Sequence, residues 1–288
     1  MTYIIIALCG LLLILFGYYV YKESTGYVVK EVNFTSNKIK KENIKIAFLS
    51  DLHNTQHGEK NCLLYDDIEK YNPDFIIFAG DMVTSHMERD YSGYQPTLDF
   101  IEKLAKKWPV YYGIGNHEEH FRRDAHKFPG MYEDISNKAK NIGAPIICDE
   151  IIDLSDYGIK IYGLDLEHDY YKRFSPKQIE DGYLKGKFGD VDKDEYSILI
   201  AHNPEHFDAY AKWGPDLVLS GHLHGGIVYL PVLGGVISPS FTLFPKYDAG
   251  EFNKGNTKML ISRGIGSHTM PLRINNKAEL IFINLSEK

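Results

Sequence analysis

Five short apolar runs, each stopped by a polar residue, constrain this chain most strongly. The runs are IKIAFLSD, PDFIIFAGD, PVYYGIGNH, YSILIAHN and PDLVLSGH, and they end at Asp51, Asp81, His117, Asn203 and His222. Each run is almost continuously apolar, contains β-branched and aromatic residues, and is bounded by Pro, Gly or polar residues. This pattern is typical of strands that are covered on both faces.

Helix-like stretches lie between some of these runs, at residues 61–71, 97–107 and 178–185. Strands that alternate with helices predict βα units and an α/β fold. In such sheets, ligands bind at the carboxyl ends of the strands, which is where the polar residues of the five runs lie. Core packing does not require potential metal ligands at these positions, so we expect a functional site at this edge.

The last quarter of the chain has a different pattern. GIVYLPVLGGV, TKMLISRGIG and KAELIFINL read as strands joined by Gly, Pro and Asn turns, with little helix between them. They predict a second, more antiparallel sheet. The cysteines, Cys9, Cys62 and Cys148, have no motif spacing, so we expect neither a disulfide framework nor a cysteine zinc site.

The N-terminus carries an apolar segment without charge over about nineteen residues, from Tyr3 to Tyr21. As a helix it would be roughly 28 Å long, close to the thickness of a bilayer's hydrocarbon core. We expect a retained single-pass membrane anchor; the alternative is a cleaved signal peptide. No Lys or Arg precedes the run and no small-x-small site follows it, which disfavours cleavage. The nearest basic residues, Lys22 and Lys30, lie on its C-terminal side and place the rest of the chain in the cytoplasm.

Three parts of the chain are therefore expected. Residues 1–22 form the anchor, residues 23–43 form a polar, lysine-rich tether that can include a short strand at Tyr27 to Phe34, and residues 44–288 form the main domain. The domain of about 250 residues is large enough to bury its own core. The net charge of −7 argues against nucleic acid as a stable partner, but not against an enzyme that meets an anionic substrate with bound cations.

The candidate metal ligands begin with Asp51 and His53, in a D-x-H sequence at a strand end. Side chains at positions i and i+2 point to the same side of an extended chain, so both can face one metal ion. Asp81 follows Gly80, and its carboxylate can bridge two cations. The alternative for Asp81 is a strand-ending residue that caps the next helix.

The other candidates follow in the sequences GNHE, AHN and GHLHGG. Asn116 offers an amide oxygen, and the adjacent His117 can be directed at substrate. His202 is either a ligand or a satisfied core histidine. His222 and His224 repeat the i, i+2 spacing between glycines, a pattern typical of metal binding.

Taken in order, DxH, GD, GNHE, AH and GHxH resemble the calcineurin-like metallophosphoesterase superfamily, from about Ile44 to Leu285. The stretch SRGIG, at residues 262–266, with Pro271 and Arg273, is similar to the membrane-associated bacterial branch of YkuE-type and YaeI-type phosphoesterases. The resemblance implies a four-layer α/β/β/α sandwich, preceded here by the N-terminal helix, with the metals at strand edges between the two sheets.

The resemblance also implies which residues bind the two divalent metal ions, which can be Mn, Fe or Zn. The first ion would be held by Asp51, His53, Asp81 and His224. The second would be held by Asp81, Asn116, His202 and His222. Two ions about 3.5–4 Å apart would activate a water for in-line attack on phosphorus. His117 would act as general acid, with Glu118 orienting it.

The expected function is hydrolysis of a phosphodiester, such as a lipid-linked or nucleotide-linked envelope precursor. The alternatives are a phosphomonoesterase and a non-catalytic metal-binding scaffold of the same fold. The segment after Asp81 lacks the GDxxDRG pattern of Ser/Thr protein phosphatases, which disfavours protein dephosphorylation.

Arginines and further histidines near the ligands are candidates for substrate binding. An arginine beside the metals would suit recognition of a second phosphate, so Arg263, Arg273 and the nearby His268 are assigned this role. The alternative for Arg263 is a buried structural ion pair. His57 and His120 lie close to ligands in sequence and can also contact substrate.

Overall fold

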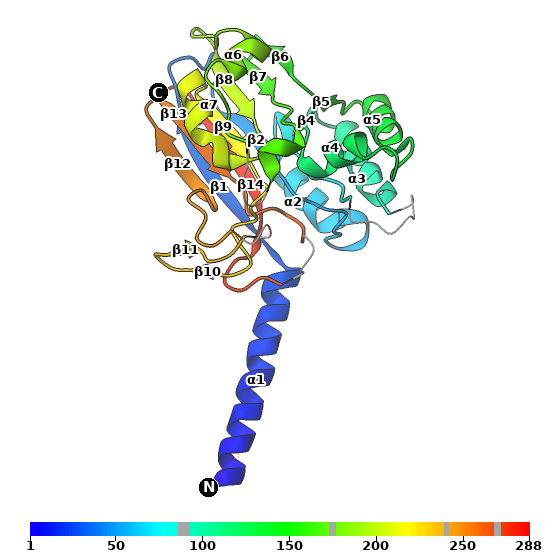
Figure 1. Ribbon diagram of the computed structural model, residues 1–288, viewed down its shortest axis with the longest axis vertical. Coiled ribbons are helices and arrows are strands. Elements are labelled where there is room, and N and C mark those ends of the chain that lie inside the picture. Colours follow the sequence, from blue (N-terminus) through cyan, green and yellow to red (C-terminus); the bar gives the residue numbers. More distant parts are fainter. Residues whose placement is uncertain (86–92, 173–176, 239–241, 268–271) are drawn as a thin grey trace.

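The computed structural model describes residues 1–85, 93–172, 177–238, 242–267 and 272–288. Two six-stranded sheets form its centre (Figure 1). The first sheet consists, in spatial order, of β1 (Tyr27–Thr35), β14 (Ala278–Ser286), β2 (Ile44–Leu49), β3 (Phe75–Ala79), β4 (Val110–Gly113) and β5 (Ile146–Ile147). The second consists of β12 (Gly250–Lys254), β13 (Thr257–Ile261), β9 (Leu217–Ser220), β8 (Tyr196–Ile200), β7 (Ile159–Gly163) and β6 (Glu150–Leu154).

Helices cover the outer face of each sheet. The first half of the domain contributes α2 (Cys62–Tyr71), α3 (Gln95–Ala105), α4 (Asn116–Arg123) and α5 (Met131–Asn141). The second half contributes α6 (Tyr183–Phe188) and α7 (Phe207–Trp213). Short 3-10 turns, η1 (Glu59–Asn61), η2 (His168–Tyr171) and η3 (Pro204–His206), complete the connections.

Three apolar layers hold the sheets and helices together. The middle layer lies between the two sheets and contains Phe48 of β2 and Ile198 of β8. The outer layers lie under the helices, with Leu98 of α3 on the first sheet and Phe207 of α7 on the second. This arrangement confirms the predicted four-layer α/β/β/α sandwich, and it explains why the strands are apolar on both faces.

All five apolar runs form strands, namely β2, β3, β4, β8 and β9. Neighbouring strands among them are parallel, β2 with β3, β3 with β4, and β8 with β9. Their carboxyl ends therefore meet at one edge of each sheet.

The prediction of a separate, more antiparallel sheet in the last quarter is wrong. β13 joins the second sheet in parallel with β9, and β14 lies between β1 and β2 in the first sheet. β14 is buried at nearly every position, so it requires a place with cover on both faces. Only the short β10 (Tyr229–Leu230) and β11 (Gly234–Gly235) form an additional two-stranded sheet in the described residues.

The segment from residue 23 to 43, predicted as a tether, contributes a strand to the domain. β1 pairs with β14 in parallel over its whole length, from Tyr27 to Thr35. Part of this segment therefore belongs to the first sheet, and the short strand expected at Tyr27 to Phe34 is present.

The N-terminal helix α1 (Thr2–Thr25) projects from the domain in Figure 1. Within the described residues it is the one helix long and apolar enough to cross a membrane, with a mean hydropathy of 2.4. Its last turns contact the segment before β14. The Asn276 backbone N–H donates to Glu23 Oε2 (3.1 Å), and the Arg273 backbone N–H donates to Ser24 Oγ (2.9 Å).

Candidate metal centre

The turns that follow β2, β3 and β9 have an unusual backbone conformation. Five candidate ligands in them have positive φ angles between 48° and 69°, namely Asp51, His53, Asp81, His222 and His224. Non-glycine residues rarely adopt this left-handed region, and such residues concentrate at functional sites. The sequence argument for D-x-H assumed an extended chain, and this assumption is wrong. The left-handed turns, not strand alternation, direct these side chains to the sheet edge.

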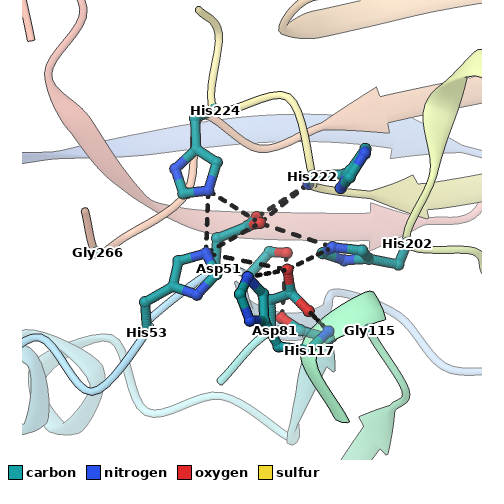
Figure 2. A network of polar contacts seen from close by, with 12 residues as sticks. Asp51, His53, Asp81, Gly115, His117, His202, His222, His224 and Gly266 are labelled. Atoms are coloured by element: carbon teal, nitrogen blue, oxygen red, sulfur yellow. Dashed lines mark hydrogen bonds and ion pairs between the residues drawn. The ribbon is translucent and has the colours of Figure 1, made fainter. Parts of the chain in front are cut away.

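These side chains converge between the two sheets (Figure 2). Together with His117 and His202 they form three overlapping groups. The ligand atoms within each group lie within 4.8 Å of one another: Asp51, His53 and His224; His53, Asp81 and His117; and Asp81, His202 and His222. Asp81 and His53 each belong to two groups. The groups thus share members in the way expected of a site for two ions.

The shortest contacts in the cluster join ring nitrogens to carboxylates or to each other. Asp81 Oδ2 lies 3.0 Å from His202 Nε2, and Asp51 Oδ1 lies 3.3 Å from His224 Nε2. His53 Nε2 and His224 Nε2 face each other at 3.1 Å. Polar atoms concentrated on one point in a buried region are typical of side chains that coordinate a cation.

The electrostatics favour a deprotonated set of ligands. Burial and the neighbouring His202 lower the pKa of His222 to about 3, and burial and His117 lower the pKa of His53. Although burial opposes it, the contact with His224 lowers the pKa of the Asp51 carboxyl. His202 is the exception, because Asp81 raises its pKa to about 10 against the effect of burial. Ionised carboxylates and neutral imidazoles are the forms that bind metal.

Asn116, the first residue of α4, provides an independent test of the fit. Its Oδ1 atom is buried and has no hydrogen-bond partner among the described residues. An unsatisfied buried amide oxygen costs about 1–3 kcal/mol, unless a ligand satisfies it. Mixed carboxylate, imidazole and amide donors suit Mn, Fe or Zn, so the residues present fit divalent cations.

Two glycines allow the ligand turns to pack so closely. A Cβ atom at Gly115 would overlap the backbone nitrogen and the carboxylate of Asp81. A Cβ atom at Gly221 would overlap Asp51 and the Ser50 hydroxyl. Gly115 and Gly221 are therefore required because the backbone at these positions lies against the turns that carry Asp81 and Asp51.

His117 is oriented by Ser85. The Ser85 backbone N–H donates to His117 Nδ1 (2.8 Å), and Ser85 Oγ lies 2.7 Å from the same atom. A backbone N–H can only donate, so in the neutral ring the proton is on Nε2. That nitrogen faces the cluster, 3.9 Å from Asp81 Oδ2. Sequence reasoning missed Ser85, because no spacing rule connects it with His117.

Glu118 was expected to orient His117, but the residue that contacts His117 Nδ1 is Ser85. The buried Glu118 carboxylate accepts hydrogen bonds from the backbone of Asp81 and Gly115 (both 3.0 Å) and from the Tyr112 hydroxyl (2.6 Å). It therefore fastens the Asp81 turn to the GNHE turn. Burial and the negative charge of Asp81 raise the pKa of Glu118 to about 7. A cation at Asp81 would offset this repulsion.

Arg263 and Arg273 contact protein groups. Arg273 is buried, donates to the carbonyl oxygens of Arg263 (2.9 Å) and Gly266 (2.7 Å), and lies 3.3 Å from His224 Nδ1. Arg263 stacks on the ring of Tyr229 at 4.2 Å. These contacts support the loop beside His224; the substrate role stays a prediction. His268, the third candidate, lies outside the described residues.

The two other histidines considered for substrate binding have partners in the protein. His57 Nε2 lies 2.7 Å from the carbonyl oxygen of Ile265, which indicates a structural role. His120 Nδ1 lies 2.8 Å from Ser85 Oγ, and its Nε2 lies 2.9 Å from Asp124 Oδ2. His120 therefore extends the contacts of His117 toward Asp124.

Replacing Ser85 with alanine is expected to lower kcat by about 10–100-fold, because loss of a partner that orients a functional histidine has effects of this size. KM and metal content should stay unchanged, and Ser85→Thr should restore kcat. Steady-state kinetics with parallel metal analysis test this, with Ser155→Ala on the exposed surface as control. Wild-type kcat in Ser85→Ala would remove Ser85 from the site.

Glu118→Gln is expected to destabilise the fold by about 2–3 kcal/mol, since an amide nitrogen would face backbone N–H donors. For a domain of this size that corresponds to a melting temperature about 5–10 °C lower. Thermal unfolding in mild detergent, followed by circular dichroism, measures the change. Glu69→Gln is the control, because its ion pair with Lys107 is exposed and contributes less than about 1 kcal/mol. An unchanged melting temperature would contradict the fastening role.

The family described as calcineurin-like phosphoesterase matches residues 44–226, more than half of the chain. The uncharacterized metallophosphoesterase Cj0846 of Campylobacter jejuni is 27% identical over 90% of this chain, which spans 63% of that protein's length. YkuE of Bacillus subtilis is 25% identical over 85% of this chain and 79% of its own.

The phosphodiesterase YaeI of Escherichia coli is 25% identical over 94% of this chain and 92% of its own. The family match covers the strands and turns that build the candidate metal centre, from β2 to the GHLHGG sequence. The chain belongs to the calcineurin-like phosphoesterase family.

Proposed function

We propose that this chain is a phosphoesterase that depends on two divalent metal ions and hydrolyses a phosphodiester. The observation that carries the proposal is the convergence of two carboxylates and five imidazoles on one point, with Asp81 shared between groups. The family match supports phosphoester chemistry, and the name of YaeI, a phosphodiesterase, supports the diester class.

Two of the three groups support the proposed ligand sets, and the third group, His53, Asp81 and His117, lies between them. Asp51, His53, Asp81 and His224 hold one ion. Asp81, Asn116, His202 and His222 hold the other. The bound ions, Mn, Fe or Zn, supply Lewis-acid stabilisation of the phosphoryl oxygens and activation of the attacking water.

His117 supplies the proton for the leaving group in this proposal. Its Nε2 atom faces the cluster, while Ser85 holds Nδ1. To donate a full proton from Nε2, the ring must carry a second proton on Nδ1. Ser85 Oγ, at 2.7 Å, can accept a hydrogen bond from that proton, but the Ser85 backbone N–H, which donates to Nδ1 of the neutral ring, must then move away from this atom.

The substrate class is tested with the full chain in detergent, loaded with Mn. A diesterase hydrolyses bis(p-nitrophenyl) phosphate with a higher kcat/KM than p-nitrophenyl phosphate, whereas a monoesterase shows the reverse order. A scaffold hydrolyses neither. Diesters with and without acyl chains, presented in mixed vesicles, then separate a lipid-linked substrate from a soluble nucleotide diester.

We also propose that α1 anchors the chain in a membrane as a single span, with the catalytic domain on the cytoplasmic side. The support is the length and hydropathy of α1 and the basic residues that follow it. The full chain should remain with the membranes after alkaline extraction. Release into the soluble fraction would contradict the anchor.

A further inference from the structure

Exposed apolar side chains outside α1 gather at one place on the domain. In the described part of the chain nine large apolar residues beyond α1 and the preceding Met1 are exposed, and five of them form what we call the hairpin patch: Leu230, Val232, Leu233, Leu243 and Phe244. The last two adjoin the hairpin, because Leu243 forms a β-bridge with Ile237 and the Phe244 N–H donates to the carbonyl oxygen of Val236 (2.9 Å). Val28 and Val29 follow α1 directly, which leaves only Leu63 and Ile151 elsewhere. A concentration of this kind marks a contact surface rather than scattered surface residues.

The hairpin patch is joined to α1 by a short series of hydrogen bonds. The Asn275 backbone N–H donates to the hydroxyl of Tyr19 in α1 (3.1 Å), and Asn275 Nδ2 donates to the carbonyl oxygen of Tyr229 in β10 (3.1 Å). The Tyr229 N–H donates to the carbonyl oxygen of Ile274 (3.0 Å). The segment 273–276 therefore lies between α1 and the hairpin of β10 and β11.

These contacts set the depth of the hairpin patch relative to α1. Tyr19 lies near the end of the apolar stretch, where tyrosines belong to the interfacial belt of a membrane span. Tyr19 is six residues before Thr25, the last residue of α1, which is about 9 Å along the helix axis. The domain therefore contacts α1 within its apolar stretch and not only at its C-terminal end. Figure 1 shows β10 and β11 at the end of the domain from which α1 extends.

We propose that the hairpin patch inserts into the membrane interface beside α1 and forms a second membrane contact. The inference rests on the proposed role of α1 as a membrane span. The occupant that fits is a lipid surface, because the patch lies next to the helix at the level of its interfacial tyrosines. Apolar side chains such as Phe244, Leu233 and the fully exposed Val232 are stabilised by burial at the boundary between headgroups and acyl chains.

The same segment also contacts the metal centre. Asn276 Nδ2 donates to the carbonyl oxygen of His224 (2.8 Å), and the Arg273 guanidinium lies 3.3 Å from His224 Nδ1. Contacts at α1, the hairpin and His224 thus meet in residues 273–276. Two membrane contacts would fix the orientation of the catalytic domain, and with it the metal centre, relative to the bilayer.

The test uses the full chain, reconstituted in vesicles of phosphatidylethanolamine and phosphatidylglycerol, with the photo-crosslinking residue benzoylphenylalanine at a single position. Position 232 reports on the hairpin patch. Position 151, exposed on β6, is the matched control, and position 12, in the middle of α1, reports on the anchor. Lipid adducts are expected at positions 12 and 232, with about tenfold or more at 232 than at 151.

The outcomes separate this inference from the anchor on which it rests. Adducts at 12 with only control levels at 232 would overturn the hairpin contact and leave the anchor intact. Control levels at both positions would overturn both. Crosslinks from 232 to a second copy of the chain, without lipid adducts, would assign the patch to a protein contact and contradict the inference. In addition, Val232→Glu with Leu233→Glu should reduce lipid adducts from a reporter at position 244; undiminished adducts there would also contradict it.

Discussion

Replacing Asp81 with asparagine is expected to abolish metal binding and hydrolysis together. Its Oδ2 atom lies 3.0 Å from His202 Nε2 and 3.9 Å from His53 Nε2, so one carboxylate faces both proposed ion positions. Asparagine keeps the shape but replaces one oxygen with an NH₂ group, which cannot coordinate a cation. Loss of a partner that merely orients a ligand weakens metal binding about 10–100-fold, so loss of the shared ligand should exceed about 100-fold.

The matched control is Asp192→Asn, which removes an ion pair with Lys160 in the half-exposed region outside the metal centre. It should keep its metal content and its activity. Metal analysis after gel filtration, together with the diester assay, measures both variants. An Asp81→Asn variant that retains two ions and wild-type turnover would refute the shared carboxylate.

His117→Ala is expected to separate metal binding from turnover. The proposed ligand sets do not include His117, so the variant should keep both ions. Removal of a general acid lowers turnover by about 10²–10⁴-fold. The comparison of kcat with metal content, with the exposed His126→Ala as control, measures the effect.

The dependence on the leaving group tests the assigned role. Nitrophenolate leaves readily without a proton, whereas an alkoxide does not, so the loss in His117→Ala should be larger for an alkyl diester than for a nitrophenyl diester. An equal loss for both substrates would show that His117 acts by another route than proton donation. Unchanged turnover would remove it from the mechanism.

The sequence was informative where one local pattern has one structural solution. The runs that end at Asp51 and Asp81 are almost continuously apolar, which predicts strands covered on both faces, and parallel strands bring their carboxyl ends to one edge. That reasoning places distant residues together without any knowledge of the loops. The strand pattern predicted βα units and an α/β fold, whereas the four layers were implied by the resemblance to the calcineurin-like superfamily.

The sequence was uninformative where the solution depends on tertiary contacts. Nothing in KAELIFINL shows which of two sheets β14 joins, since a strand buried on both faces fits either. The left-handed turns at Asp51 and His53 are imposed by packing against neighbouring strand ends, so D-x-H was interpreted with the wrong backbone. Ser85 and Glu118 likewise have their roles through contacts with residues more than thirty positions away.

The central claim is that the clustered carboxylates and imidazoles, with Asn116, hold two cations that share Asp81. Electron paramagnetic resonance of the full chain titrated with Mn²⁺ tests it most directly. The account predicts two bound ions per chain and a spin-coupled spectrum, because the ions would be about 3.5–4 Å apart. Only isolated Mn²⁺ signals, or no binding in excess Mn²⁺, would contradict it.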